Sequence, residues 1–461
     1  MVTSLSENMS IPTLRASLHG QLILPGEAAY ESARRIYNGA IDRRPAYIIR
    51  CVDANDVQRA VEFGRQSNLD IAVRGGGHSF PGLSTCDNGL VIDLSPMQAV
   101  SVNVHDQSAR AEPGVTLGGL IEATQAYGLG TNTGTVSDTG IAGLTLGGGI
   151  GWLMGKYGLT CDSVRSFEVV TADGRLLNAN ANENADLYWG LRGGGGNFGI
   201  VTAFDYQLHS LGTILGGMVV HPLSRARSVL QFYRDFTHEL PDELTAACAM
   251  LTTPDGQPVI GLLMCYCGDL SQGERVIAPL RKFGPPLLDR IQPMPYAGMF
   301  ALLDSSVSAG RHYYLKGGSL PALSDGAIEN LVDSAEGLTS PYSHIAMMPV
   351  HGAASRVGAS ETAFSFREEH YEFYIMAAWE DDGQDRHVQW VRQSYQTLER
   401  FTSQRAYVNF LGDDGTARVR AAYGPNYQRL VALKTKYDPE NVFHLNQNIK
   451  PNTRVSIKSE T

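Results

Sequence analysis

The first part of the chain reads as short strands separated by tight turns. Brief apolar runs stand between polar and glycine-rich stretches, and the stretch from Ile200 to Leu208 alternates apolar and polar positions in the period of a strand. Asp173-Gly174 separates two apolar runs, which predicts a hairpin. Strands are expected at 70–74, 91–94, 99–104, 164–171 and 200–208.

Two helices are predicted within this strand-rich part. Val57, Ala60, Val61 and Gly64 share one helical face just before the strand at 70–74. A second helix is expected over 117–127, with Gly128 as its C-terminal cap.

The pattern changes from about residue 209, where longer helical periods alternate with strands. Strands are expected on both sides of Asp255-Gly256 and at 344–350 and 371–379. The expected helices span 226–240, 273–283, 326–336 and 387–401. This order predicts an α+β domain with a largely antiparallel sheet and helices on one side. Residues 407–449 are expected to add a strand, a helix over 427–436 and a turn at Asn-Gln-Asn-Ile.

Composition narrows the possible partners. The 461 residues allow two or three domains, and a net charge of −10 leaves no basic footprint for nucleic acid or an anionic membrane. The six cysteines are scattered without zinc-site spacing, so no metal site is expected. No apolar leader core is visible in residues 1–20, which predicts a cytoplasmic protein. The uncharged run from Thr139 to Gly155 contains seven glycines and suits a loop better than a membrane span.

Glycine carries the main functional signal. Of 50 glycines, 26 lie between Ile71 and Ile200, in clusters at 74–79, 140–151 and 193–199. Such loops expose backbone N–H groups and admit close approach of a pyrophosphate or a flat ring system. Three of them predict a large dinucleotide lying extended across the loops.

The last cluster also matches the Rossmann pattern literally. Gly194, Gly196 and Gly199 satisfy G-x-G-x-x-G, but a helix-like segment precedes them and a strand follows. The Rossmann fingerprint needs a strand before the glycines and a helix after them. A nicotinamide site is therefore not expected here.

His78 is the second signal. It ends the glycine turn Arg-Gly-Gly-Gly-His-Ser, where a ring system could come within bonding distance. The alternative is an ordinary structural histidine.

Several spaced motifs together resemble one family. RGGGHS, the glycine pattern from Gly140 to Gly151, KYGLTCD, RGGGGNFG, YVNF and YDPENVFHLNQNI are similar to the berberine-bridge-enzyme-like flavoprotein oxidases, within the wider vanillyl-alcohol-oxidase group. The N-terminal stretch YESARRIYNGAIDRRPAYIIRC further resembles bacterial polyketide-tailoring members of the favorskiiase type.

The resemblance implies an architecture. It predicts an α+β protein with a two-part PCMH-type FAD-binding domain and a substrate domain. The expected segments are an FAD-binding part at 1–208, a substrate-binding domain at 209–402, and a berberine-bridge-like segment at 403–461 that returns to the FAD domain.

The resemblance also implies how the cofactor is held. The family joins the matching histidine, here His78, to the 8α-methyl of FAD. Many members add a cysteine bond at the position that Val136 occupies, so a single linkage is expected, and Cys161 lies in a different motif. Thr139 falls at the position that gates oxygen access. The residues expected to bind the cofactor are Arg74, Gly75, Gly76, Gly77, His78, Ser79, Val136, Ser137, Asp138, Thr139, Gly140, Gly143, Leu144, Gly196, Gly199, Ile200, Val201, Tyr407, Asn446 and Asn448.

The catalytic base departs from the family pattern. Many relatives carry a tyrosine at the end of Y-x-N-Y, where this chain has Phe410, which cannot take a proton. Tyr407, His351, His344 and Asp138 remain as candidates, each with a plain structural alternative. Alternation along 344–350 lets at most one of the two histidines line a site on that sheet. Thr139, His351 and Tyr407 are the expected catalytic residues.

The function implied is an FAD-dependent oxidase that transfers a hydride to the flavin, with O2 as acceptor. A phenolic or polyketide-like substrate of antibiotic or secondary metabolism is expected, with cyclisation and a homodimer left open. A sugar or alcohol oxidase and a redox-neutral FAD-containing cyclase are the alternatives. Methionines on the predicted strands suggest either an apolar substrate pocket or only a core: Met250, Met264, Met347, Met348 and Met376.

Overall fold

A computed structural model describes residues 9–304, 306–412 and 414–452. Residues 1–8 and 453–461 lie outside the described residues. They include the ends of the first and third predicted segments and part of the stretch on which the expected lack of a leader rests.

The N-terminal layer is a four-stranded sheet in the order β1-β2-β4-β3. Strands β2, β4 and β3 are parallel to one another, and the edge strand β1 is antiparallel to β2. The Asp53 side chain caps helix α3 (Ala54–Gln66), whose apolar face packs on this sheet, as predicted. The strands are β1 (Gln21–Ile23), β2 (Tyr47–Arg50), β3 (Ile71–Arg74) and β4 (Leu90–Asp93).

A second, antiparallel sheet follows in the order β5-β6-β10-β8-β9. The predicted hairpin joins β8 to β9, with Gly174 at φ 81° in its turn. Helix α4 (Leu117–Gln125) ends just before Gly128, whose φ of 65° suits the expected cap. The strands are β5 (Val100–Asn103), β6 (Ser108–Ala111), β8 (Val164–Val170), β9 (Leu176–Asn180) and β10 (Ile200–Gln207).

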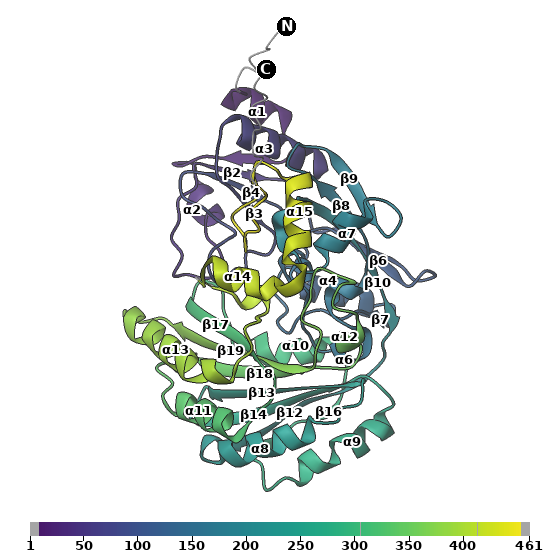
Figure 1. The fold of residues 1–461 in the computed structure, drawn as a ribbon, viewed down its shortest axis with the longest axis vertical. Coiled ribbons are helices and arrows are strands. Elements are labelled where there is room, and N and C mark those ends of the chain that lie inside the picture. Colours follow the sequence, from purple (N-terminus) through teal and green to yellow (C-terminus); the bar gives the residue numbers. More distant parts are fainter. Residues whose placement is uncertain (1–8, 305, 413, 453–461) are drawn as a thin grey trace, which may run out of the picture.

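The largest sheet has eight strands, all paired antiparallel, in the order β15-β12-β14-β13-β18-β19-β17, with β16 beside β12. Figure 1 shows its four long helices on the side away from the N-terminal layers. This confirms the predicted antiparallel sheet with helices on one face. The strands are β12 (Ile214–Pro222), β13 (Leu244–Thr252), β14 (Pro258–Tyr266), β15 (Leu288–Asp289), β16 (Gln292–Met294), β17 (His312–Leu320), β18 (His344–Val350) and β19 (His370–Trp379). The helices are α8 (Ala226–Phe236), α9 (Leu270–Lys282), α11 (Asp325–Glu336) and α13 (Gln384–Leu398).

The two faces of this sheet have different partners. Met250, Met264 and Met347 lie in the core between the sheet and its helices. Met348 and Met376 lie on the opposite face, which meets the N-terminal part of the chain. Three of the five methionines therefore belong to the core on the helix side, and the other two lie on the face that could border a site.

The C-terminal segment returns to the N-terminal layers. Helices α14 (Gly415–Tyr423) and α15 (Tyr427–Tyr437), yellow in Figure 1, lie beside the N-terminal sheets, away from the helices under the large sheet. Lys434 is fully buried, and its ammonium donates to the Asp438 carboxylate at 2.7 Å and to the carbonyls of Asn197 and Phe443. A buried cation thus ties this helix to the third glycine run.

Several elements differ from the sequence expectation, among them the short strands β1, β2 and β6, which were not predicted. The strand expected at Tyr407 is wrong, because residues 408–410 form a 3-10 turn that packs its side chains into two neighbouring clusters. Helix α14 was not predicted. Strands β12 and β17 were also missed, because Gly216-Gly217 and Gly317-Gly318 interrupt their alternation.

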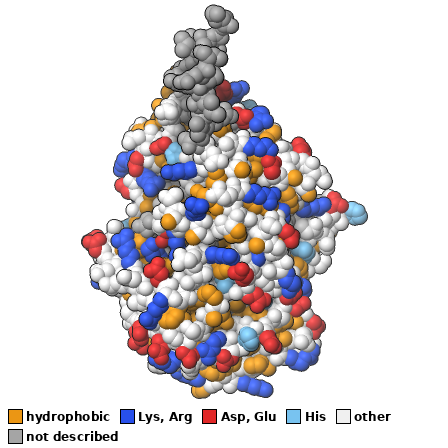
Figure 2. Space-filling view, in the orientation of Figure 1, with side chains coloured by type: hydrophobic (Ala, Val, Ile, Leu, Met, Phe, Trp, Pro, Cys, Tyr) orange, Lys and Arg blue, Asp and Glu red, His pale blue; other side chains and the backbone are white. Residues whose placement is uncertain are grey.

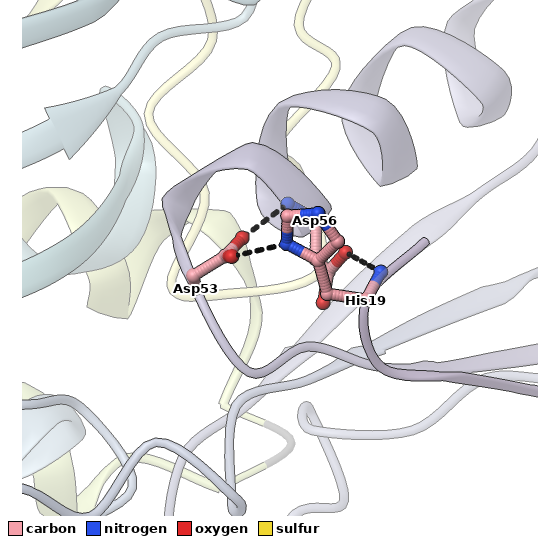
Figure 3. Close-up of side chains that lie close together, drawn as sticks. All are labelled: His19, Asp53 and Asp56. Atoms are coloured by element: carbon pink, nitrogen blue, oxygen red, sulfur yellow. Dashed lines mark hydrogen bonds and ion pairs between the residues drawn. The ribbon is translucent and has the colours of Figure 1, made fainter. Parts of the chain in front are cut away.

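A cluster at His19, Asp53 and Asp56 resembles a metal-binding group but is already satisfied. Asp56 accepts hydrogen bonds from the backbone N–H groups of His19, Gly20 and Val52, and Asp53 lies 2.6 Å from the His19 ring (Figure 3). These bonds join the start of α3 to the turn before β1. The cluster therefore has a structural role.

Charge on the surface is mixed where Figure 2 shows it. On the face drawn in Figure 2, acidic and basic side chains are interspersed without a continuous basic area. Within the described residues, every helix is too short or too polar to cross a bilayer.

The buried ion pair in α15 leads to a stability prediction. Lys434→Met should lower the free energy of unfolding by about 3–5 kcal/mol, because it leaves the Asp438 carboxylate buried without a cation. Lys436→Met, two residues along, breaks the surface pair with Asp186 and a contact with the Tyr437 ring, and should cost less than about 1 kcal/mol. Urea denaturation of both variants provides the measurement; equal losses would contradict the assignment.

Candidate functional site

The first glycine loop is anchored by a buried ion pair at its start. Arg74 ends β3 and donates to both oxygens of Asp93, at 3.1 and 2.6 Å, and to the Arg35 carbonyl. Burial would raise the pKa of the Asp93 carboxyl, but hydrogen bonds and charge from Arg74, with help from Ser95, hold it below its ordinary value. Arg74 is therefore committed to positioning the loop and is not free to clamp a phosphate.

The first two glycine loops touch through their backbones. A methyl group on Gly76 would lie 2.5 Å from the Gly140 nitrogen, and Gly75 approaches the Pro113 carbonyl almost as closely. Gly77 has φ 69°, a conformation that favours glycine. Only residues without side chains allow these two segments to meet.

His78 projects from this contact. Its ring stacks on Tyr37 with centroids 3.8 Å apart and meets Phe80 edge-on. Its Nε2 lies 3.3 Å from the exposed Asp138 carboxylate but makes no hydrogen bond with good geometry, and the Tyr37 hydroxyl is buried without a partner. Two buried polar atoms thus lack a hydrogen bond at the predicted attachment point.

The loop 136–139 is held from both sides. Ser137 donates its N–H and hydroxyl to Asp304, at the end of α10 (Ala297–Asp304), while its carbonyl accepts from Gly118. The Thr139 carbonyl accepts from Leu117, at the start of α4. These bonds place Val136, Asp138 and Thr139 beside the His78 loop.

Helix α5 (Ile141–Leu146) links the three glycine clusters. Gly140 begins it, and the Gly193 N–H donates to the Leu146 carbonyl at its end. The third run then meets the C-terminal Asn-Gln-Asn turn, where Asn446 donates to the Gly196 carbonyl at 3.2 Å.

The glycines divide into those that pack and those that leave space. Gly147, Gly148 and Gly149 press against the 407–409 segment, Phe364 and Thr160, so their task is close packing. Gly143 and Gly196 have no atom within 4 Å of where a side chain would begin. Beside this open space, the amide oxygens of Asn446 and Asn448 are buried and unpartnered.

These observations fit a bound dinucleotide. Open backbone at Gly143 and Gly196, unpaired donors and acceptors at Tyr37, His78, Asn446 and Asn448, and Ser79 in the same loop offer what a phosphate and a polar ring need. Gly199, Ile200 and Val201 are packed where β10 begins, so any contact they make is through backbone.

Tyr407 supports the second glycine loop. Its hydroxyl oxygen accepts from Gly149 N–H at 2.9 Å and from the Asn409 amide at 2.8 Å, and Asn409 also donates to the Leu144 carbonyl. Burial raises the pKa of the Tyr407 phenol despite these donors. These hydrogen bonds give Tyr407 a structural role, in which it holds the second glycine loop in place.

His351 lies apart from the cofactor loops. It follows β18 and packs against Gly155 of α6 (Met154–Tyr157) and near Asp242. Burial lowers the pKa of its imidazole. None of these contacts involves the loops around His78.

Comparisons with known proteins agree with this geometry. The family described as FAD binding domain matches residues 45–180, and the family described as berberine and berberine like matches residues 406–450. An FAD-linked oxidoreductase of Dictyostelium discoideum is 33% identical over 443 residues, covering 94% of this chain and 95% of its own. The chain belongs to the berberine-bridge-enzyme-like family of FAD-linked oxidoreductases.

Solved structures of other oxidases resemble this oxidoreductase in fold. The crystal structure of 6-hydroxy-D-nicotine oxidase from Arthrobacter nicotinovorans matches with a TM-score of 0.86 and 28% identity, covering 95% of this chain and 99% of that one. A chitooligosaccharide oxidase matches with a TM-score of 0.83 and 25% identity, covering 94% and 97%. Both confirm the PCMH-type α+β fold, and FAD is the cofactor of this oxidoreductase.

In the oxidoreductase, aromatic side chains gather where the large sheet meets the N-terminal part of the chain. Asn38 donates to the carbonyls of Phe80 and Tyr313 and accepts from the Tyr313 N–H, which ties the N-terminal loop to β17. The cluster at this junction contains or packs against the following residues: Tyr37, Phe80, Val136, Val307, Tyr313, Leu315, Tyr374, Met376, Ala378 and Phe410. We call this set the junction cluster.

The junction cluster contains a residue that the sequence analysis missed. Phe410 meets Tyr374 of β19 edge-on at 5.1 Å, and the Tyr374 hydroxyl lies 3.2 Å from Nε2 of His344 on β18. The sequence indicates His344 as a candidate base, whereas no motif distinguishes Tyr374 from the other residues of its strand. Its even spacing from Glu372 and Met376 was the available signal that it shares their face of the sheet.

The open space at Gly143 gives a prediction for the oxidoreductase. Gly143→Ala should leave the unfolding temperature of the flavin-free protein unchanged or slightly raised, because alanine is the better helix former. In the His78→Ala background, where flavin is held by reversible binding, it should raise the dissociation constant of FAD about fivefold if a lost cofactor contact costs on the order of 1 kcal/mol. Gly212→Ala in the same background, also in open space but in an exposed loop, is the control. An unchanged dissociation constant in the Gly143 variant would show that the cofactor lies elsewhere.

Proposed function

We propose that this oxidoreductase is an oxidase that holds FAD through one covalent bond, from His78, and oxidises a phenolic or polyketide-like aromatic compound. The observation that carries the proposal is the placement of His78. It ends the backbone-to-backbone loop contact, stacks on Tyr37 and leaves Nε2 without a hydrogen bond, 3.3 Å from the Asp138 carboxylate.

A single bond is supported by the neighbouring loop. Val136 stands at the position where a second, cysteine linkage would form, and it packs in the junction cluster. Cys161 is fully buried, and burial raises the pKa of its thiol far above the ordinary value. It is neither exposed nor ionised enough to attack a ring.

The aromatic substrate class is supported by the junction cluster. Its partly exposed rings, those of Phe80, Tyr374 and Phe410, pack edge-on in the cluster and offer apolar area that suits a flat aromatic ligand. We propose that the oxidation belongs to secondary metabolism, as in polyketide-tailoring enzymes of the favorskiiase type. We also propose that the domain boundaries fall near residues 208 and 402.

The chain's own residues then have separate tasks. When bound, FAD supplies the two-electron acceptor and passes electrons on to O2. Arg74 and Asp93 fix the loop that carries His78, and Asp304 fixes the loop with Thr139. The junction cluster orients the substrate and excludes water.

The linkage can be tested by acid precipitation. Wild-type protein should give a yellow pellet, since the flavin stays with the chain. His78→Ala should release its flavin into the supernatant, and His105→Ala, at an exposed position, should behave like the wild type. A yellow pellet from the His78 variant would place the bond on another residue.

The substrate class can be tested by peroxide release. The panel consists of 4-hydroxybenzyl alcohol, vanillyl alcohol, an anthraquinone phenol, 6-hydroxynicotine and chitobiose. Peroxide is expected with phenolic members. Turnover of chitobiose instead would favour the sugar oxidase alternative, which the chitooligosaccharide oxidase structure supports. Flavin with no peroxide from any member would favour a redox-neutral cyclase.

A further inference from the structure

A tyrosine and a histidine stand together on the face of the large sheet that meets the FAD domain. Tyr374 lies on β19 between Gly317 of β17 and Ala346 of β18, and His344 lies one pair further along, opposite Met376. Met376 belongs to the junction cluster, and Tyr374 and Phe410 pack on it. Both polar side chains are partly exposed, so a ligand in the junction can reach them.

The hydrogen-bond geometry gives each group a direction. His344 Nδ1 lies 3.5 Å from the Tyr342 carbonyl, which can only accept, so we assign the ring proton to Nδ1. Nε2 is then the acceptor for the Tyr374 hydroxyl at 3.2 Å. With its own proton turned toward His344, the Tyr374 oxygen presents lone pairs to the junction.

Each side chain keeps some exposure, but the protein around the pair removes most of its water and keeps it uncharged at neutral pH. This desolvation lowers the pKa of His344 to about 4, against a weak opposing effect of the Tyr342 carbonyl, and raises the pKa of Tyr374 to about 12. Ionisable groups on the packed elements are engaged elsewhere: Glu372 with Ser319, Lys316 with Asp414, Asp304 with Ser137, and Asp138 beside His78. Tyr37 and Tyr313 are neutral phenols in the same cluster.

We propose that Tyr374, oriented by His344, accepts the hydrogen bond of a substrate hydroxyl or N–H and takes its proton when the substrate is oxidised. This inference rests on the proposed oxidase function and names the group that acts where Phe410 cannot. It also narrows the substrate to compounds with a donor on the carbon that is oxidised.

The proton balance is complete. The substrate gives two electrons and a hydrogen nucleus to the flavin that the proposed function supplies. Its O–H or N–H proton moves to the Tyr374 oxygen, and the Tyr374 proton moves to Nε2 of His344. An alcohol that has lost a hydride is a protonated carbonyl, which is strongly acidic, so an imidazole of low pKa is a sufficient acceptor. The resting substrate keeps its proton.

The first test measures binding of 4-nitrophenol to the yellow protein by difference absorbance. Tyr374→Phe should weaken binding about three- to tenfold, the effect of one hydrogen bond of about 0.5–1.5 kcal/mol. Tyr371→Phe is the matched control, because it removes a phenol from the same strand that faces the helix side and bonds Thr237. Equal affinity in all three proteins, or no binding by the wild type, would overturn the proposal.

The second test separates positioning from packing at His344. His344→Gln keeps an acceptor for the Tyr374 hydroxyl and should retain most 4-nitrophenol affinity, while His344→Leu should lose it as Tyr374→Phe does. If both variants bind like the wild type, His344 does not orient Tyr374. This comparison decides the matter even if the Tyr374 variant fails to fold.

Kinetics test the proton step on whichever panel compound releases peroxide. Tyr374→Phe should lower kcat more than it raises KM, and Tyr371→Phe should change neither. Unchanged kcat would overturn the proton role. A colourless protein would overturn the proposed oxidase function instead, so the two failures are distinguishable.

The pH dependence of stability supplies a readout that needs no substrate. Because the His344 pKa is about 4 in the folded protein and near 6.5 in the unfolded chain, the unfolded chain binds more protons between these values. Wild-type stability should therefore fall as pH drops from 6.5 toward 4, and His344→Gln should reduce that fall. Comparison with the wild type removes the similar effects of His209, His221 and His351. An identical pH dependence in both proteins would contradict a buried, neutral His344.

Discussion

The site depends on peptide backbones approaching each other more closely than any side chain would permit. Gly76 and Gly140 meet at such a distance, and each occupies the volume that a methyl group on the other would need. This contact sets the position of His78 on one side and the start of α5 on the other. Other glycines allow similarly close contacts with Tyr407 and Phe364, and Gly196 meets the C-terminal turn.

Buried charge pairs hold these thin segments in place. Arg74 with Asp93 fixes the first loop, Arg367 with Asp162 braces the segment after the second loop, and Lys434 with Asp438 secures the C-terminal helix against the third. Each pair is almost fully shielded from water and is completed by further hydrogen bonds to backbone or side-chain groups. Such pairs stabilise little in net terms, but losing one partner is costly, so they specify one arrangement of the loops.

Local patterns were enough to predict most of the fold. Helix α3, the β8–β9 hairpin, the cap at Gly128 and the antiparallel sheet all follow from short-range periodicity and turn residues. Strands β12 and β17 escaped because paired glycines carry no face preference. The segment at Tyr407 was misread because its apolar residues serve two separate clusters, which a linear pattern cannot reveal.

The candidate site was predictable only where a motif carried it. His78 and the glycine loops are contiguous in sequence, whereas Tyr374 and His344 come together through the pairing of β18 with β19. Likewise, that Arg74 is occupied by Asp93 follows from the parallel pairing of β3 with β4. Tertiary register, which no single sequence displays, decides these roles.

The amide of Asn38 has a consequence for how ligands come and go. It fastens the N-terminal loop to the edge strand β17 by two hydrogen bonds with the Tyr313 backbone, and a third bond holds the Phe80 carbonyl beside them. Pulling β17 away from this loop would exchange the two bonds to Tyr313 for bonds to water, at a net cost of about 0.5–1.5 kcal/mol each. Asn38 therefore favours the arrangement in which the two parts stay together while a ligand enters or leaves.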